Sequence, residues 1–182
     1  RSNDEVIIPD FTFVATANAV KYTGAKVVTV DIDDDTLCVS PEAIKKAITS
    51  KTKAIIPVHV YGHPANMVEI NKIAKEYNLF VVEDAAEAHG AKVNGRKVGG
   101  LSDVGTFSFF GNKIITSGEG GMITTNNEEL YKKINSAVFP GYQGGPLMHV
   151  IAAKAAAFNE ALKSDFKVYI KKILENAKIL SE

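Results

Sequence analysis

The first two thirds of the chain alternate between short β-branched runs and stretches in which apolar residues recur at helical spacing. This alternation is typical of strand–helix–strand units, whose right-handed crossovers build a mostly parallel sheet with helices on both faces. Strands are predicted at residues 6–8, 26–31, 54–60, 79–82, 106–110 and 121–125, and helices at residues 14–22, 64–77 and from Pro41 onwards. The pattern therefore predicts an α/β fold built as a three-layer sandwich.

Local signals refine where these elements begin, end and pair. Ser40 can cap the helix that starts at Pro41, and Pro57 indicates an end or a bulge in its strand. Asn94-Gly95 is the turn signal of a hairpin within residues 92–96. The uniformly apolar run at 79–82 is expected in the middle of the sheet, where both faces of a strand are covered.

The alternation of predicted strands and helices ends at about residue 134. Residues 139–146 contain two prolines and three glycines and are predicted to form a loop. Two amphipathic helices follow, at 147–162 and 166–180, and each should pack its apolar stripe on another surface. We expect a single domain over residues 1–182, with parts of different character at 1–134 and 135–182.

Charge and cysteine content exclude several classes of protein. The 182 residues carry 21 Lys+Arg and 21 Asp+Glu, so there is no excess of basic residues with which to bind nucleic acid. No apolar run approaches the roughly 20 residues of a membrane span, so no membrane partner is expected. The single Cys38 excludes an internal disulfide and fits a reducing, cytoplasmic location, unless the chain is recombinant without a native one.

Two charged residues stand where ligand sites lie in parallel sheets, beyond the carboxyl ends of strands. Asp84 follows the apolar strand, and is either the cap of the next segment or an anion aimed at a cationic ligand group. Lys113 lies between aromatic residues and the glycine tract at 118–121. Most loop lysines are solvated, but a partly desolvated lysine can attack a carbonyl carbon.

No metal site is expected from the sequence. The acidic run at 31–35 lacks the glycine and the terminal glutamate of a calcium loop, so it is interpreted as a solvated turn. The four histidines show no spacing typical of metal ligands.

Three segments together resemble the nucleotide-sugar aminotransferases, which are fold-type-I enzymes dependent on pyridoxal phosphate. These are FTFVATANA (11–19), EDAAEAHGA (83–91) and FSFFGNKIITSGEGG (107–121). The resemblance implies a truncated large domain of that fold, in which residues 121–125 form an antiparallel strand near an edge. It further implies that Lys113 bonds the cofactor aldehyde and moves a proton, and that Asp84 keeps the pyridine nitrogen protonated.

The same resemblance implies three further cofactor contacts. Phe13 would stack on the cofactor ring, and the Ser108 hydroxyl would donate to the phosphate. Glu87 occupies a position where the family often has glutamine, near the 3′-oxygen of the cofactor. An ionised carboxylate would repel a phenolate there, so Glu87 departs from the family pattern.

Residues 135–179 resemble a different branch of the fold, serine hydroxymethyltransferase. There the Gln-Gly-Gly-Pro loop, here 143–146, offers backbone N–H groups to the cofactor phosphate of the partner subunit. Gly145 is therefore a candidate contact across a homodimer interface. Because two families meet near residues 131–135, we hypothesise an engineered chimera.

Both families also use segments that this sequence does not include. A phosphate-binding helix N-terminus would precede Asp4, and a small domain would follow the large one. We therefore expect weakened cofactor binding. Two functions stay open: a chimeric fragment that binds pyridoxal phosphate through Lys113 with little turnover or none, and an active aminotransferase whose small-molecule substrate is a keto-sugar nucleotide.

Overall fold

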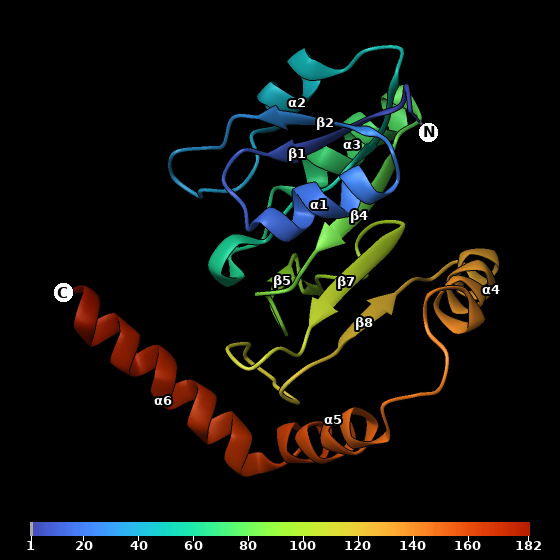
Figure 1. The fold of residues 1–182 in the computed structure, drawn as a ribbon. Coiled ribbons are helices and arrows are strands. Elements are labelled where there is room, and N and C mark those ends of the chain that lie inside the picture. The colour runs from blue at the N-terminus through green and yellow to red at the C-terminus, as the bar shows by residue number, and fades with distance from the viewer. Residues whose placement is uncertain (1) are drawn as a thin grey trace.

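The computed structural model describes residues 2–182 and is built around a six-stranded sheet (Figure 1). The strands follow the order β2-β1-β3-β4-β7-β8, and all neighbours are parallel except β8, which is antiparallel to β7. The strands are β1 (Glu5–Pro9), β2 (Lys26–Val30), β3 (Thr52–Ile55), β4 (Phe80–Asp84), β7 (Val104–Ser108) and β8 (Gly121–Thr124), with a separate hairpin of β5 (Lys92–Val93) and β6 (Arg96–Lys97). This topology confirms the mostly parallel sheet and the antiparallel edge strand.

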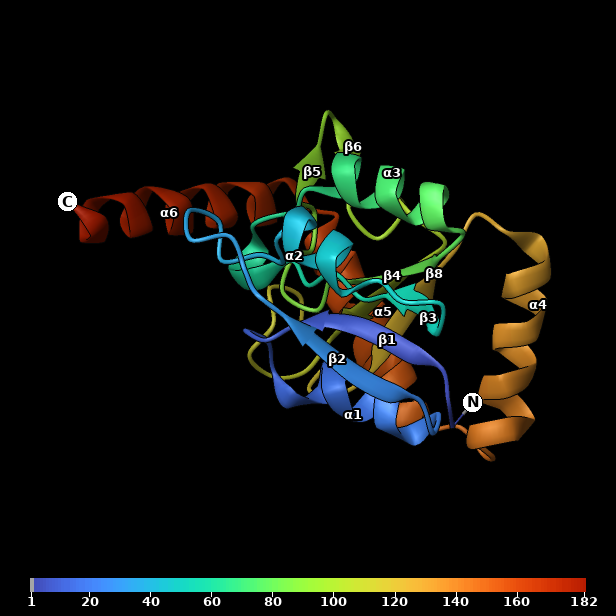
Figure 2. The same cartoon turned by 90° about the horizontal axis from the view of Figure 1, so that it is seen from above.

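Helices cover both faces of the parallel part of the sheet. The helices are α1 (Val14–Tyr22), α2 (Pro41–Ala47), α3 (Met67–Tyr77), α4 (Glu128–Ser136), α5 (Met148–Ala161) and α6 (Ser164–Ser181), with short turns η1 (Val60–Gly62) and η2 (Ala137–Tyr142). Figure 2 shows α1 on one side of the sheet and α2 and α3 on the other. The three-layer arrangement is therefore the one that the sequence predicts.

The alternation of side chains along β1 produces these two layers. Ile7 and Ile8 are both buried and point to opposite faces of the sheet. Ile7 packs with the apolar faces of α2 and α3, including Ile44 and Met67, whereas Ile8 packs with Val20 of α1. Burial of these side chains is the main favourable term in holding each layer on the sheet.

Side-chain caps explain where the helices begin and end. The Ser40 hydroxyl accepts a hydrogen bond from the Ala43 N–H at 3.3 Å, as predicted for the start of α2. Helix α3 begins at Met67 and not at the predicted Pro64, because the Asn66 side chain caps it by accepting from the Glu69 N–H at 3.2 Å. Asn78, with φ of 53°, ends α3 in the left-handed conformation.

Two observed strands have other bounds than the predicted ones, and the hairpin is confirmed. β3 ends at Ile55, five residues before the predicted end, and Pro57 lies just beyond it. β7 begins and ends two residues earlier than predicted. Asn94 and Gly95 have φ of 50° and 80°, the two positive values that a two-residue turn of this type requires.

The tail differs from the prediction at one point. Part of the predicted loop forms the turn η2, which is interrupted where Phe139 is extended. Helix α5 lies beside β8, where the Phe158 and Phe109 rings meet edge to face with centroids 5.0 Å apart. Helix α6 leads away from the sheet (Figure 1), and no side chain of α6 is buried within the described chain, so the packing of its apolar stripe on another surface stays a prediction.

None of the helices in residues 2–182 combines the length and apolar character needed to cross a membrane.

Candidate functional site

A lysine and a glutamate meet beyond the adjacent carboxyl ends of β4 and β7. These strands are neighbours in the sheet, with Asp84 in register with Thr106. The Lys113 Nζ lies 3.6 Å from Glu87 Oε1, and the Lys113 side chain is only 17% exposed. The structure thus brings together two of the predicted site residues, and Lys113 is largely withdrawn from water.

The Asp84 carboxylate is held by hydrogen bonds from two other segments. Its Oδ2 accepts from the Thr16 hydroxyl at 2.8 Å, and its Oδ1 accepts from the Ala86 N–H at 3.2 Å. Residues 85–88 form a turn and no helix, so Asp84 caps the next segment as a turn, through the Ala86 N–H. Because Thr16 belongs to α1, this contact fixes the first turn of α1 against the end of β4.

The Glu87 carboxylate is fixed between a backbone donor and a lysine. Its Oε2 accepts from the Tyr61 N–H at 3.0 Å, while Oε1 faces the Lys113 amine. Glu87 therefore supplies a carboxylate partner for Lys113.

Phe13 and Ser108 lie at the same edge of the sheet. Phe13 precedes α1 at its N-cap position and is 78% exposed, so its ring is available for stacking. Ser108 ends β7, and its hydroxyl accepts from the Phe110 N–H at 3.3 Å. A serine hydroxyl that accepts one bond still has its own proton to donate.

Gly145 lies elsewhere. It is exposed, and it lines a groove between β8 and α5 together with Gly121, Leu147, Ile151 and Lys154. The structure does not group Gly145 with Lys113 and Glu87, and its role toward a partner subunit stays a prediction.

His89 is a site neighbour that the sequence analysis did not select, although it lies in the quoted segment 83–91. Its ring is packed against the Phe107 and Phe109 rings, with centroids 5.3 and 5.6 Å away. Both ring nitrogens are buried without a well-formed hydrogen bond from residues 2–182. Burial lowers the pKa of His89, the charge of Lys113 acts in the same direction, and the Ser108 backbone opposes them in part.

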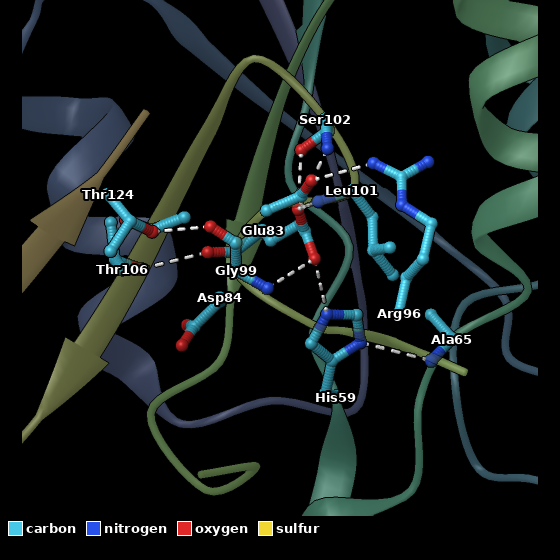
Figure 3. Close-up of polar contacts among 12 residues, drawn as sticks. His59, Ala65, Glu83, Asp84, Arg96, Gly99, Leu101, Ser102, Thr106 and Thr124 are labelled. Atoms are coloured by element: carbon cyan, nitrogen blue, oxygen red, sulfur yellow. Dashed lines mark hydrogen bonds and ion pairs between the residues drawn. The ribbon is translucent and has the colours of Figure 1, made fainter. Parts of the chain in front are cut away.

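Glu83 is the second acidic residue at the end of β4, and its side chain is fully buried on the other face of the sheet (Figure 3). Its carboxylate accepts from His59 and from the loop after β6. Burial alone would raise the pKa of Glu83, but the hydrogen bonds from His59, Gly99, Leu101 and Ser102 outweigh it and hold that pKa below its ordinary value. The sequence contains one indication of this position. Glu83 and Asp84 are neighbours in a strand, and neighbouring side chains of a strand point to opposite faces of the sheet.

The acidic run at 31–35 forms an exposed turn. The Asp33 carboxylate closes it by accepting from the Thr36 N–H and hydroxyl, both at 3.0 Å. Across the described part of the chain, no three His, Cys, Asp or Glu side chains are placed to hold a metal ion.

Comparison with known proteins connects this arrangement with one family. The sequence model of the DegT/DnrJ/EryC1/StrS aminotransferase family matches residues 1–163. Among characterised relatives, GDP-perosamine synthase of Escherichia coli O157:H7 is 55% identical over 130 residues, which are 71% of this chain and 36% of the relative. The chain thus spans about a third of the length of this relative.

Solved structures agree in fold. An aminotransferase from Psychrobacter cryohalolentis superposes with a TM-score of 0.75 and 37% identity, covering 85% of this chain and 46% of that one. NtdA of Bacillus subtilis, solved with its bound cofactor PMP, gives a TM-score of 0.67 and 43% identity, with coverage of 72% and 29%. The chain belongs to the DegT/DnrJ/EryC1/StrS aminotransferase family.

Proposed function

We propose that this chain binds pyridoxal phosphate through Lys113, as the cofactor-bearing part of an aminotransferase that acts on a keto-sugar nucleotide. The observation that carries the proposal is the partly buried Lys113 amine, paired with Glu87 beyond the ends of two adjacent parallel strands. Membership of the aminotransferase family and the PMP bound to NtdA support the choice of cofactor.

The residues at this edge of the sheet fit the chemistry of that cofactor. The group has an aldehyde, a basic ring nitrogen, a flat aromatic face and a phosphate. The edge offers an amine at Lys113, a carboxylate at Asp84, an exposed ring at Phe13 and a hydroxyl at Ser108. These four functional groups of the cofactor thus each have a chemically matched side chain.

Pyridoxal phosphate supplies an electron sink when it is bound. Asp84 would hold the proton on the ring nitrogen, and Thr16 fixes the Asp84 carboxylate for that contact. Glu87 would orient the Lys113 amine, which would hold the cofactor at its aldehyde carbon and, when free of it, would accept the proton taken from the substrate. Phe13 would cover one ring face, and Ser108 would donate to the phosphate.

The substrate is proposed from the relatives, and the partner from the exposed position of Gly145. GDP-perosamine synthase is named for an amino-sugar nucleotide, which supports a keto-sugar nucleotide as the acceptor of the amino group. We propose a homodimer in which the Gly145 backbone contacts the phosphate in the partner's site. The exposed position of Gly145 on the groove beside β8 leaves it accessible to a second chain.

The test is an absorption spectrum recorded after adding pyridoxal phosphate. The wild type is expected to develop a visible band that free cofactor lacks, because an amine has bonded the aldehyde. Lys113→Ala should lose this band, and Lys154→Ala should keep it as a matched control, since Lys154 contacts Gly121 on β8. A band that survives in Lys113→Ala, or its absence from the wild type, would overturn the proposal.

A second candidate is a chimeric fragment that binds the cofactor with little turnover. The curated relatives match over 130 to 134 residues, whereas the family model extends to residue 163, so the alignments do not decide between the two candidates. Adding glutamate to the cofactor-loaded protein separates the two. Loss of the Lys113-dependent band as the amino group is transferred supports the aminotransferase, and an unchanged band supports the fragment.

A further inference from the structure

Glu83 accepts five hydrogen bonds although none of its side chain is exposed. Its Oε1 accepts from the Leu101 N–H at 2.8 Å and from the Ser102 N–H and hydroxyl, both at 2.9 Å. Its Oε2 accepts from the Gly99 N–H at 2.7 Å and contacts His59 Nε2 at 3.2 Å (Figure 3). Because every neighbour is a donor, only the ionised carboxylate satisfies this cluster.

Glu83 also determines which nitrogen of His59 carries the proton. His59 is fully buried, and its Nδ1 accepts from the Ala65 N–H at 3.1 Å. An accepting Nδ1 leaves Nε2 as the protonated nitrogen, which donates to Glu83. The imidazole is therefore neutral, and Glu83 holds it in the tautomer that can accept from Ala65.

The bond from Ala65 to His59 closes the segment between them into a loop. Backbone bonds from Gly62 N–H to His59 O at 3.3 Å and from His63 N–H to Val60 O at 2.9 Å tighten it. Tyr61 lies at its tip with φ of 51°, a conformation that costs a non-glycine residue free energy and persists only where its surroundings impose it. The His59 ring is the side chain that spans the base of this loop.

The tip of this loop reaches the proposed cofactor site. The Tyr61 N–H donates to Glu87 Oε2 at 3.0 Å, and Glu87 Oε1 faces Lys113 Nζ at 3.6 Å. A methyl group at Gly62 would lie 3.3 Å from the Glu87 carbonyl oxygen, so the loop and the Glu87 backbone are in close contact. A displacement of the loop would therefore displace the Glu87 carboxylate from Lys113.

We propose that His59 is a positioning residue for Lys113: its Nδ1, kept in the accepting tautomer by Glu83, fixes the 59–65 loop, whose Tyr61 N–H holds the Glu87 carboxylate beside the Lys113 amine. This role deepens the proposed function, since it concerns the amine that would bond the cofactor. Neither side chain touches the reacting groups, so both act through Tyr61 and Glu87.

Two substitutions of His59 separate its two hydrogen bonds. In His59→Asn, the amide oxygen takes the place of Nδ1 and can still accept from Ala65, while the contact with Glu83 is lost. In His59→Gln, the amide nitrogen takes the place of Nε2 and can still donate to Glu83, while the acceptor for Ala65 is lost. Both substitutions replace the buried ring with an amide side chain, so each variant is a control for the loss of the ring itself.

The readout is the rate at which an amine-directed reagent modifies Lys113 at pH 7, measured by peptide mapping without cofactor. His59→Gln is expected to raise this rate about two- to fivefold, because the amine loses its carboxylate partner. His59→Asn should stay near the wild-type rate. Lys72, which pairs with Glu69 on the surface, is the internal control and should react equally in all three proteins.

An unchanged Lys113 rate in His59→Gln, or an equal rise in both variants, would overturn the inference. If either variant does not unfold cooperatively, and so is not properly folded, the modification experiment is replaced by amide hydrogen exchange measured on the wild type. The Tyr61 and Ala65 amides should then exchange at similar rates, and free exchange at Tyr61 with protection at Ala65 would overturn the inference. Neither measurement uses the cofactor, so a missing absorption band would overturn the proposed function alone.

Discussion

At the scale of single residues, the end of β4 carries two adjacent carboxylates with separate surroundings. Asp84 faces α1 and accepts from Thr16, whereas Glu83 faces the loop at residues 99–102 and is completely buried. The strand itself produces this separation, because consecutive side chains point to opposite faces. One carboxylate is thus available at the sheet edge, while its neighbour is committed to five donors inside the protein.

Replacing Glu83 with glutamine tests how much the buried carboxylate and its hydrogen bonds contribute to the free energy of unfolding. The amide of Glu83→Gln would place N–H groups against donors, which leaves buried groups unpaired and should lower the free energy of unfolding by about 3 kcal/mol. Urea denaturation measures this loss. The matched control is Glu76→Gln, which removes an exposed pair with Lys45 and should cost less than about 1 kcal/mol. Equal losses in the two variants would show that the buried cluster adds no stability.

The same substitution predicts a pH dependence. The pKa of Glu83 lies below its ordinary value in the folded protein, so its ionisation contributes stability above the unfolded-state pKa. That contribution is lost as the pH falls through the folded-state pKa. The difference in unfolding free energy between wild type and Glu83→Gln should therefore narrow below about pH 4. A constant difference down to pH 3 would contradict the assignment.

His89 predicts a second pH dependence, in a different range. Its lowered pKa means that the unfolded chain binds a proton more readily than the folded one, so the free energy of unfolding should fall from pH 7 to pH 5.5. His89→Leu keeps an apolar side chain beside Phe107 and Phe109 and should flatten this slope. His149→Leu, at an exposed position on α5, should keep the wild-type slope. A slope unchanged in His89→Leu would assign the pH dependence to another group.

At the scale of elements, two glycines let the loop that binds Glu83 lie directly on β7. A methyl group at Gly105 would collide with the Gly99 backbone, and one at Gly99 would collide with the Phe107 ring. Gly99 also has φ of 78°, which other residues rarely adopt. The loop therefore delivers its N–H groups to Glu83 only because both positions lack a side chain.

Gly105→Ala should accordingly be costly although alanine is small. The contact is with backbone, which cannot rotate away, so the free energy of unfolding should fall by about 2 to 3 kcal/mol. Gly144→Ala is the matched control, since a methyl group there meets no atom within 4 Å, and its effect should stay within about 0.5 kcal/mol. Denaturant unfolding of both variants measures the difference. A tolerated Gly105→Ala would mean that the loop is not fixed on β7.

The elements show what a sequence can and cannot predict. Local signals succeed, since Ser40 caps α2 and Asn94-Gly95 forms its turn. The antiparallel edge strand at 121–124 is also confirmed, but that prediction came from the family resemblance and not from a local pattern. The role of Glu83 could not be predicted, because its donors lie 16 to 19 residues later or, for His59, 24 residues earlier. The contact of Glu87 with Tyr61 likewise depends on a loop fold that no local pattern encodes.

At the scale of the whole molecule, the body and the tail are stabilised very differently. The sheet and its covering helices hold a core in which Ile70 of α3 is completely buried. Helix α6 projects from this body, and Ile173 on it remains 43% exposed. Several other large apolar side chains of α6 are more exposed still, such as Leu174 at 66%. An apolar stripe of this kind contributes little to folding of the single chain and much to any contact with a second one.

An isoleucine-to-alanine substitution in α3 and another in α6 measure how differently the body and the tail contribute to stability. Ile70→Ala removes buried methylene groups and should lower the free energy of unfolding by about 2 to 5 kcal/mol at any protein concentration. Ile173→Ala should change it by less than about 0.5 kcal/mol in dilute protein, where α6 has no neighbour. If the chain forms the proposed homodimer through α6, the cost of Ile173→Ala should grow as protein concentration rises, because association stabilises the folded state by mass action. A large cost that is independent of concentration would instead place α6 against its own sheet in solution.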